Sequence, residues 1–376
     1  MFAGVNPGPA APPEPRLTVA FLLYNASRDV EELVEALDRQ RHPAFERQSG
    51  WLEAVFVDDA SRDGTAETAR RALAARGGPP HVRLVVHETN LGLARTLNEL
   101  IAAARTPFVL TCHLDCRFGR DDYAAAMLGL MERRPEAAAI TGQPVLPPAS
   151  TLSFAEKLNV VANLMDVLPV DAKEELVPVG FAEGRCDVFR VEALRAVGGY
   201  DTHLRVSGED QVLAARLREK GFTIYQAPQL TYELSVSGEQ DSISKLLRHQ
   251  WLFGRTTPYI VLAVPGSTAG FVGPQAGSNR TRRALLRLTQ LLGTVVWPLV
   301  LVGLVAGWPA WAWAAPLGLV AVTKLALQAR HVALVRFSAG QLLRYALLQP
   351  LLDLAYAAGI LEGLGRLALG RARPIG

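Results

Sequence analysis

Acidic and polar side chains gather at four places in the sequence, and side chains of these types can bind a metal ion, a nucleotide or a reacting hydroxyl. The clusters are Tyr24–Asn25, Asp58–Thr65, His113–Arg117 and Ser207–Asp210. Asp58 and Asp59 are adjacent, and adjacent carboxylates at the end of a buried strand repel each other unless a partner is supplied. Together with Asp115 they indicate a site for a nucleotide or a metal-bound diphosphate.

Some neighbouring residues are better explained by structure than by chemistry. Asp63-Gly64 is a turn signal, and Thr65 is typical of a helix N-cap. Asn90-Leu91-Gly92 favours a loop and a helix start, while Arg95 in the first turns of that helix can approach a nucleotide. A lone histidine such as His113 is more often a satisfied core residue than a ligand.

Short apolar runs alternate with amphipathic stretches from Leu17 to about Ala227, and this pattern predicts the elements that position the clusters. Strands are expected at Leu17–Leu23, Leu52–Val57, Val82–Val86, Phe108–Thr111 and Ala138–Thr141. Helices are expected at Val30–Arg39, Thr65–Arg76, Leu93–Ala104 and Asp122–Arg133. Such alternation predicts an α/β fold with a doubly wound, mostly parallel sheet. Ligands of these sheets bind at the carboxyl ends of the strands, where the polar clusters fall.

Several classes of protein are excluded. No GxGxxG follows the first strand and no GxxxxGK[ST] occurs, so neither a dinucleotide oxidoreductase nor a P-loop NTPase is indicated. The three cysteines form no CxxC pair, which excludes a disulfide framework and a structural zinc site. With 49% hydrophobic and 20% charged residues, the chain can bury a core.

The C-terminal part has the composition of a membrane domain. The chain has a net charge of +3, yet eleven basic and only two acidic residues lie from residue 276 onward. Residues 288–323 contain no charged side chain, which suits two short spans joined at Gly307–Trp311. A third apolar segment, Tyr345–Leu361, is interrupted by Pro350 and Asp353. We expect apolar segments at about 288–306, 311–328 and 345–363; the third either spans the membrane or lies along its surface.

The charges that flank these segments set the expected orientation. Four arginines (Arg280, Arg282, Arg283 and Arg287) precede the first span, and Lys324, Arg330 and Arg336 follow the second. The positive-inside rule places both flanks in the cytoplasm. Asp353 is costly in hydrocarbon and must face protein or water, with no partner evident from the sequence. A soluble helical domain is the less favoured alternative.

These patterns divide the chain into four parts. Residues 1–15 contain five prolines and are expected to be a disordered lead without the features of a signal peptide. Residues 16–240 form the α/β domain, 241–284 an interfacial helix and linker, and 285–376 the membrane domain.

The order of the polar motifs carries a family resemblance. The set comprises Tyr24-Asn25, Asp58-Asp59 with Ser61 and Asp63-Gly64-Thr65, Asn90-Leu91-Gly92 with Asn98, Leu114-Asp115, Gly198-Gly199-Tyr200-Asp201 and Gly208-Glu209-Asp210. Over roughly residues 17–255 it resembles the family 2 glycosyltransferases with a GT-A fold. The resemblance implies an enzyme that binds a nucleotide-sugar across the strand ends.

The resemblance also implies how the donor is held. Tyr24, Asn25 and Asp58 match positions that hold the base and ribose, with Asp59 and Arg95 nearby. A carboxylate accepts from a ring N–H such as that of uracil, which favours a UDP-sugar. Asp115 matches the first acid of the DxD motif, which reaches the ribose and a divalent metal, Mg²⁺ or Mn²⁺, on the diphosphate. Arg117 stands where the second acid would be, so it either leaves the metal with one carboxylate or itself neutralises phosphate charge.

Asp210 is the expected catalytic base, with Glu209 beside it. Transfer with inversion needs one carboxylate near the incoming hydroxyl and positive charge on the leaving diphosphate, but no covalent nucleophile. The alternative is that both acids only favour the N-terminal end of a helix through its dipole.

The segment Ser244–Arg255 separates two functional hypotheses. Processive synthases carry a QxxRW motif here, but alignment on Trp251 gives Leu247 and Gln250 at the other positions. A basic, aromatic helix lying on anionic lipid is therefore favoured over a polymerising site.

The sequence predicts a membrane-anchored, inverting glycosyltransferase of the cell membrane, with several spans and a cytoplasmic catalytic domain. Its expected partners are a nucleotide-sugar donor, a lipid-linked or growing glycan acceptor and membrane lipid, with no nucleic acid. Tethering favours a lipid-linked acceptor by raising its effective concentration. A processive polysaccharide synthase, a catalytically inactive membrane scaffold and a nucleotidyltransferase remain as alternatives.

Overall fold

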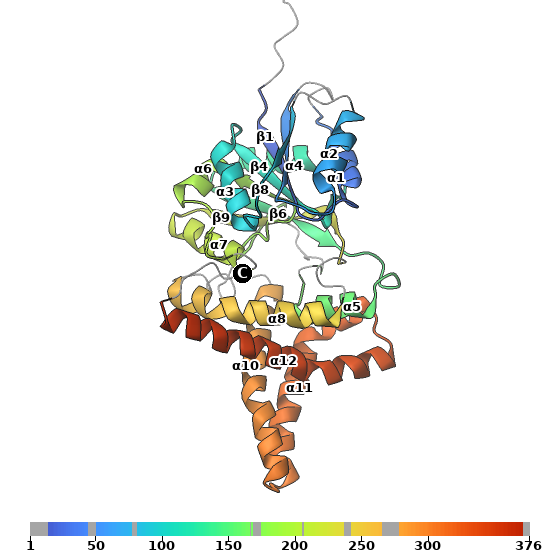
Figure 1. Cartoon of the computed structure of the whole chain (residues 1–376), viewed down its shortest axis with the longest axis vertical. Coiled ribbons are helices and arrows are strands. Elements are labelled where there is room, and N and C mark those ends of the chain that lie inside the picture. The colour runs from blue at the N-terminus through green and yellow to red at the C-terminus, as the bar shows by residue number, and fades with distance from the viewer. Residues whose placement is uncertain are drawn as a thin grey trace, which may run out of the picture.

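The computed structural model describes residues 14–43, 50–76, 81–165, 167, 174–204, 207–236, 242–264 and 278–370. A sheet with flanking helices forms the upper part of the molecule in Figure 1, and long helices lie below it. Most of the expected N-terminal lead, residues 1–13, lies outside the described residues.

Four parallel strands form one half of the sheet and contain its switch point. These are β1 (Leu17–Leu23), β2 (Leu52–Asp58), β3 (Val82–Val86) and β4 (Phe108–His113). The strand order is β3-β2-β1-β4-β8-β6-β9-β5, so the chain runs outward from β1 to β3 and then returns to the other side of β1 at β4. Ligands of open α/β sheets bind where the order reverses in this way.

The other half of the sheet is mixed. It contains β5 (Cys116–Phe118), β6 (Ala137–Val145), β8 (Asp187–Arg190) and β9 (Thr223–Leu234), while β7 (Val177–Pro178) pairs with β9. Strand β8 is antiparallel to both of its neighbours, β4 and β6, whereas β6 and β9 are parallel. The prediction of a mostly parallel, doubly wound sheet is confirmed, with these antiparallel strands added.

Helices cover both faces of the sheet, as Figure 1 shows. One layer consists of α1 (Val30–Asp38), α2 (Thr65–Ala74) and α4 (Tyr123–Arg133). The other consists of α3 (Leu93–Ala103), α6 (Val191–Ala196) and α7 (Glu209–Glu219). Alternate residues of β1 divide between the two faces, because Phe21 packs with the first layer and Ala20 with a cluster that includes Leu100 of α3.

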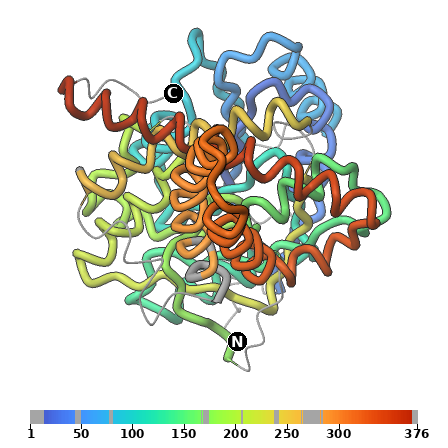
Figure 2. Tube along the Cα trace, turned by 90° about the horizontal axis from the view of Figure 1, so that it is seen from below, coloured from blue at the N-terminus to red at the C-terminus, as the bar shows by residue number. Residues whose placement is uncertain are grey.

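The lower helices have two directions. Helices α10 (Ser278–Val305) and α11 (Ala310–Val335) form a hairpin that projects away from the sheet, whereas α8 (Ile243–Pro258) and α12 (Ala339–Ala368) run across its upper end (Figures 1 and 2). We call the crossing pair, α8 and α12, the platform. Helix α5 (Phe154–Ala162) lies beside it, and the π-helical turn η1 (Tyr259–Ala263) continues α8.

Among the residues that the structure describes, three helices are long and apolar enough to cross a membrane: Ala284–Val305, Ala310–Val335 and Ala339–Ala368. The three apolar segments are therefore present. Helices α11 and α12 extend beyond both predicted bounds, whereas the first span begins earlier than predicted, at Ala284, and ends at Val305. Lys324 and Arg330 were expected to follow the second span. This was wrong, because both lie inside α11, where the Lys324 side chain is buried. The division of the chain at residues 240 and 285 stays a prediction.

Glycines allow the two platform helices to touch along their backbones. A Cβ atom on Gly254 of α8 would lie 2.0 Å from the carbonyl oxygen of Tyr356. On α12, a Cβ on Gly359 would lie 2.0 Å from the Trp251 carbonyl oxygen, and one on Gly363 would lie 2.3 Å from that of Arg255. Real Cβ contacts are never this short, so each of these positions requires glycine for the observed packing.

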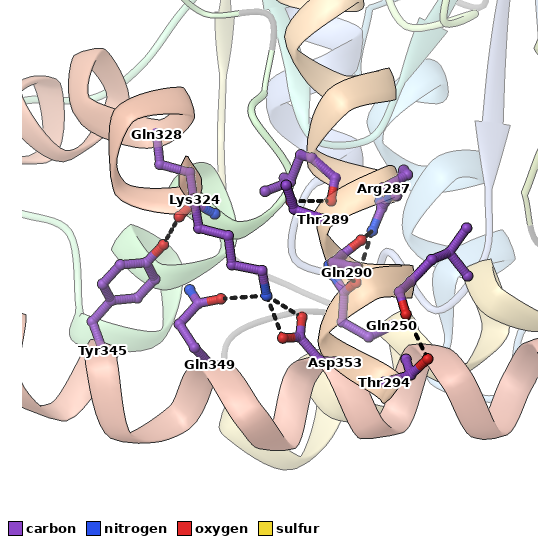
Figure 3. Close-up of polar contacts among 12 residues, drawn as sticks. Gln250, Arg287, Thr289, Gln290, Thr294, Lys324, Gln328, Tyr345, Gln349 and Asp353 are labelled. Atoms are coloured by element: carbon purple, nitrogen blue, oxygen red, sulfur yellow. Dashed lines mark hydrogen bonds and ion pairs between the residues drawn. The ribbon is translucent and has the colours of Figure 1, made fainter. Parts of the chain in front are cut away.

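A buried polar network joins the hairpin to the platform (Figure 3). Lys324 of α11 donates to both carboxylate oxygens of Asp353 on α12, which gives Asp353 its partner, and to Gln349 at 3.4 Å. The hydroxyl of Tyr345 donates to Gln328. Charged groups at this depth in an apolar region need such partners, because an unpaired charge there is costly.

A second part of the network reaches the end of α5. Arg287 of α10 donates to Gln290 at 2.8 Å and to Gln250 of α8 at 2.9 Å, and the Gln250 amide donates to Asn163 at 2.7 Å. The Nε2 atom of His331 lies 2.9 Å from the carbonyl oxygen of Met165. Hairpin, platform and the region after α5 are thus connected by directional bonds.

Replacement of Gly359 by alanine tests the platform packing. The added methyl group meets the α8 backbone, and overpacking of this kind costs about 1–3 kcal/mol, so Gly359→Ala should lower the thermal unfolding midpoint in detergent. Gly365→Ala is the matched control on the same helix, since a Cβ there meets nothing within 4 Å. Equal midpoints for the two variants would contradict the packing argument.

Candidate functional site

Three parallel strands end side by side at one edge of the sheet, and this edge gathers three of the four polar clusters. Leu23, at the end of β1, pairs with Asp58 at the end of β2. On the other side of β1, Leu22 pairs with His113 at the end of β4. Tyr24 and Asn25 follow β1 directly, and Asp115 lies in the turn after β4. With a strand spacing of about 4.8 Å, Asp58 and the end of β4 are about 10 Å apart.

Hydrogen bonds between the first two loops position Asp58. Ser61 donates its hydroxyl to the buried carboxylate of Asp58 and accepts the Asn25 N–H at 2.8 Å. The Asn25 side chain in turn accepts the Arg62 N–H at 3.1 Å. Asn25 and Ala60 have φ values of 50° and 59°, so both loops turn sharply where they meet. Tyr24 is largely exposed beside them.

Asp63 and Thr65 have the structural role expected from the sequence. The Asp63 carboxylate accepts the Ser27 N–H at 3.0 Å and the Thr65 N–H at 3.1 Å, and the Thr65 hydroxyl accepts the Ala26 N–H at 2.8 Å. Burial alone would raise the pKa of Asp63, but its hydrogen bonds with Thr65 and Ser27 outweigh burial and lower the pKa to about 2.

Asp59 turns away from its neighbour and holds the loop between β3 and α3. Its carboxylate accepts the backbone N–H groups of Leu91 and Gly92, each at 2.8 Å, and contacts Nδ1 of His87 at 2.8 Å. The other ring nitrogen of His87 lies 3.2 Å from Glu99. The expected repulsion between Asp58 and Asp59 is thus avoided, because the two carboxylates bond to different loops. Arg95 is exposed in the first turn of α3.

The side chains of Asp115 and Arg117 contact different parts of the protein. The half-buried Asp115 accepts the Ser235 N–H on its backbone oxygen at 2.8 Å, and its carboxylate accepts the Cys116 thiol at 3.4 Å. Arg117 instead reaches α1, where its guanidinium lies 2.7 Å from Glu32 and 3.5 Å from Asp29. The charge of Arg117 is therefore balanced by two acids of α1.

Charged residues that were not identified from the sequence lie near Asp115. The Arg185 guanidinium is 3.4 Å from Glu183, and the Asp187 carboxylate accepts the Gly184 N–H at 2.6 Å. Burial raises the pKa of Asp187 to about 6. Burial also lowers the pKa of His113, whose Nε2 atom has no hydrogen-bond partner within the described part of the chain, so it is not the satisfied core residue expected. Glu183, Arg185 and Asp187 occupy alternate positions up to the start of β8, and this spacing of charged residues was the available signal.

The Gly198–Asp201 motif is clamped by α3. Asn98 accepts the Tyr200 N–H at 2.7 Å and donates to the Tyr200 carbonyl at 2.9 Å. Gly199 has a φ of 72°, and a Cβ there would lie 2.3 Å from the Asn98 side-chain oxygen, so only glycine fits. The sequence showed Asn98 and this motif as separate pieces, and the fold joins them.

Asp210 and Glu209 begin α7, and the platform supports the loop that precedes them. The hydroxyls of Ser207 and Thr256 of α8 are 2.9 Å apart. A Cβ on Gly208, which has a φ of 90°, would lie 2.2 Å from the Ile260 side chain of η1. One oxygen of Asp210 accepts the Gln211 N–H at 2.8 Å, and burial raises the pKa of Glu209.

Asp201 adds a link between α7 and η1, the turn that continues α8. Its carboxylate accepts from the Tyr259 hydroxyl at 2.9 Å and pairs with Arg216 of α7 at 3.0 Å. Nδ1 of His203 lies 2.9 Å from the other oxygen. The start of α7 is therefore fixed by contacts with α8 and η1.

A single carboxylate is the protein's expected contribution to a metal site. Within the described ranges, no group of three or more His, Cys, Asp or Glu side chains could hold an ion. Asp115 alone still fits Mg²⁺ or Mn²⁺, because Mg²⁺ is commonly bound by one or two carboxylates together with substrate phosphates and water. Since Arg117 is paired elsewhere, no cation of this motif competes for the Asp115 carboxylate.

Two family models match the chain. The one described as Glycosyl transferase family 2 matches residues 18–198, and the one described as Glycosyl transferase family group 2 matches residues 115–327, which is more than half of the chain. A comparison with curated proteins found no match.

Solved structures of low sequence identity resemble this chain, and the first of the two named here has the same overall fold. Mannosyltransferase PcManGT from Pyrobaculum calidifontis, in complex with GDP-Man and Mn²⁺, is 20% identical with a TM-score of 0.55, over 96% of this chain and 90% of that chain. TarS 1-349 from S. aureus is 14% identical with a TM-score of 0.45, over 94% and 92% of the two chains. The fold and its polar edge define a glycosyltransferase of the GT-A type. The chain belongs to glycosyltransferase family 2.

The pKa of Asp63 predicts an acid-dependent loss of stability. Because the pKa in the folded protein is about 2, below the ordinary value of 3.8, ionised Asp63 stabilises the fold above pH 4 and this stabilisation is lost as the pH falls toward 2. Asp63→Asn should flatten the dependence of the unfolding midpoint on pH between 5 and 2.5. Asp121→Asn, at a surface carboxylate, should keep the wild-type slope. A wild-type slope in Asp63→Asn would contradict the assignment.

Proposed function

We propose that the protein is a membrane-anchored, inverting glycosyltransferase that transfers a sugar from a nucleotide-sugar to a hydroxyl of a lipid-linked or growing glycan acceptor. The donor binds across the carboxyl ends of β1, β2 and β4. Asp210 is the catalytic base, and Asp115 contributes the carboxylate for a divalent metal.

Asp58 and the first loop are suited to hold the nucleoside. The Asp58 carboxylate is fixed by Ser61 at the switch point of the sheet, and the exposed Tyr24 ring and Asn25 lie beside it. A carboxylate accepts from a base N–H, which both uracil and guanine offer. UDP is the nucleotide favoured from the sequence, and the GDP-Man bound by PcManGT makes GDP the alternative to test beside it.

The metal would act on the diphosphate. Asp115 would hold Mg²⁺ or Mn²⁺ together with diphosphate oxygens and water, and the bound ion would offset the negative charge of the leaving group. Mn²⁺ is present in the PcManGT structure. The pairing of Arg117 with Glu32 and Asp29 argues against Arg117 as a direct phosphate ligand, since two acids already neutralise it.

Transfer requires a proton acceptor at the incoming hydroxyl. Asp210 takes the proton as the acceptor oxygen forms its bond to the anomeric carbon and the bond from that carbon to the diphosphate breaks. Attack from the side opposite the diphosphate inverts the anomeric configuration. Glu209 stands beside the base, and one of its oxygens lacks a hydrogen-bond partner among the described residues.

The observation that carries this function is the support of the Asp210 loop by the membrane-side helices. Ser207 bonds to Thr256, Asp201 bonds to Tyr259, and Gly208 packs against Ile260. The same helix, α8, packs along α12, whose partner is the apolar hairpin. An active site built on these helices is placed for a hydroxyl carried by a membrane lipid. When enzyme and acceptor are both held at the membrane, the effective concentration of the acceptor rises.

The helix directions suggest how the chain sits in the membrane. The hairpin of α10 and α11 exposes large apolar side chains, such as Val305 at 91% and Trp311 at 74%, which suits hydrocarbon. Helix α12 crosses the hairpin, which supports the alternative in which the third apolar segment lies along the surface (Figure 2). The sheet lies on the same side of the hairpin as the basic residues that flank its helices. The positive-inside rule places that side, and with it the catalytic domain, in the cytoplasm.

Removal of the base should abolish transfer and spare the donor. Asp210→Asn should lower kcat by about 10²–10⁴-fold, measured as release of nucleoside diphosphate with membrane lipid extract as acceptor. Its dissociation constant for the nucleotide should match that of the wild type. Asp121→Asn controls for a general effect of losing a surface carboxylate. Normal turnover by Asp210→Asn would end the assignment.

The donor site is tested by calorimetric titration of UDP and, separately, GDP into the detergent-purified full chain, with and without Mn²⁺. One nucleotide should bind more tightly with Mn²⁺, and Asp115→Ala should remove the metal-dependent part while Asp121→Ala should not. Metal-dependent binding that persists in Asp115→Ala would contradict the role of Asp115. Absence of binding by both nucleotides in the wild type would favour the inactive scaffold.

A further inference from the structure

A cavity of about 720 Å³ lies between the sheet and the upper end of the hairpin, away from the carboxyl edge described above. Its walls come from the segment after β6, from α5, from β9 and from the end of α11. This volume is within the range of small-molecule sites, roughly 300–1,000 Å³. The cavity is not part of the proposed donor site, since neither Asp58, Asp115 nor Asp210 lines it.

Lys157 places a buried positive charge in this cavity. It lies on α5, it is 8% exposed, and its side chain has no hydrogen bond or ion pair within the described residues. Lysines are almost never this buried unless paired, so a side chain like this one is suited to a ligand that enters the cavity. The position is held firmly, because α5 begins with a capping box formed by Ser153 and Glu156.

The other charge on the cavity wall is also positive. Arg336 follows α11 with a φ of 50° and lines the same cavity. No aspartate or glutamate is among the residues that line it in the described part of the chain. Two cations without an acid make this cavity a site for an anion, and a phosphate group accepts hydrogen bonds from both side-chain types.

The rest of the wall is apolar and faces the membrane helices. Leu146, Leu334 and Val335 line the cavity, together with Pro147 and Pro148. Leu334 and Val335 are the last residues of α11, whose other residues include the exposed apolar surface of the hairpin. Cationic groups beside such a wall suit a ligand with a phosphate head and a hydrocarbon chain rather than a soluble anion.

The cavity is connected to the proposed catalytic edge by β9. Thr231 lines the cavity, and Ser235, four residues later, donates its N–H to the Asp115 carbonyl at 2.8 Å. Four residues of extended chain span at most about 14 Å. The two sites are therefore close enough for one ligand to have its phosphate in the cavity and its sugar-accepting end near the donor.

We propose that this cavity binds the phosphate of the lipid-linked acceptor, with Lys157 as the main contact, Arg336 as the second, and the lipid chain along Leu334 and Val335. This assignment rests on the proposed function, since it names the site at which the acceptor lipid is held. It gives the acceptor a chemical class, a phosphate ester of a long hydrocarbon chain, and it makes Lys157 a binding residue.

Native mass spectrometry of the full chain in mild detergent tests this site with farnesyl phosphate as the probe. The wild type should bind one farnesyl phosphate and no farnesol, which has the same chain without the phosphate. Lys157→Met keeps the length of the side chain and removes the charge. It should weaken binding by about 10- to 100-fold, the value expected for a lost hydrogen bond between charged groups. Lys157→Arg should bind within a few-fold of the wild type.

Lys220→Met is the matched control, since Lys220 is exposed at the end of α7. It should bind like the wild type. Unchanged affinity in Lys157→Met, or equal binding of farnesol, would overturn the proposal. Displacement of farnesyl phosphate by equimolar inorganic phosphate would assign the cavity to free phosphate. Equally tight, Lys157-dependent binding of dioleoyl phosphatidylglycerol would assign it to bulk membrane lipid, which also contradicts an acceptor site.

Nucleotide binding by the same samples separates this proposal from the proposed function. Lys157→Met should bind the donor nucleotide like the wild type, because the cavity and the donor site share no residue. Failure of the wild type to bind UDP and GDP would count against the proposed function while leaving a lipid-phosphate site in place. Loss of farnesyl phosphate binding with normal nucleotide binding in Lys157→Met is the result that only the present proposal predicts.

Discussion

Backbone contact between α8 and α12 is the constraint on which the arrangement of this protein depends. Gly254, Gly359 and Gly363 have no side chain at the points where the two helix backbones touch, so the platform can form at this close spacing. Below it, the hairpin is fixed by the bond between Lys324 and Asp353, and a Cβ on Gly293 of α10 would lie 2.8 Å from that carboxylate. Above it, Thr256 and Tyr259 bond to the segment that leads into α7. One continuous set of contacts therefore connects the apolar hairpin with the start of the helix that carries Asp210.

The buried cations of the lower helices show why Lys157 stands apart. Arg255 of α8 stacks on Trp251 at 4.6 Å and lies 3.5 Å from Glu362 of α12, and Lys324 is held by Asp353. Burial of such charges is expensive, and pairing offsets the cost without making the pair a strong source of stability. Pairing instead fixes how the helices are arranged, because each charged side chain finds its partner on only one neighbouring helix. The side chain of Lys157 lines a cavity and has no such neighbour in the described residues, which fits the proposal that a ligand completes the site.

Local pattern was sufficient to predict the parallel half of the sheet. The bounds of β1 and β3 agree with the expected ones, since runs of Val, Leu and Phe bounded by polar loops are strong local signals. The sequence also showed that the polar clusters follow strands, and the parallel order then brings Asp58 and Asp115 to one edge. It did not show β8, whose four residues pair antiparallel with two strands distant in the chain. Nor could it show that Asp59 holds a loop, that Arg117 pairs with α1, or that Lys324 pairs with Asp353, because each depends on a partner brought close only by the fold.

The start of α7 shows why the membrane-side helices belong to the proposed catalytic machinery rather than serving only as an anchor. No side chain caps this helix at Gly208, which has a φ of 90°, so the local sequence provides little to fix the direction of Asp210. The direction is set by contacts from α8 and η1, which are themselves held by α12 and the hairpin. A catalytic carboxylate must be held within about 0.5 Å of its productive position, and here the residues that hold it come from the helices next to the membrane. Placement of the protein at the membrane and orientation of the base then depend on the same packing, so a change in the platform acts on both at once.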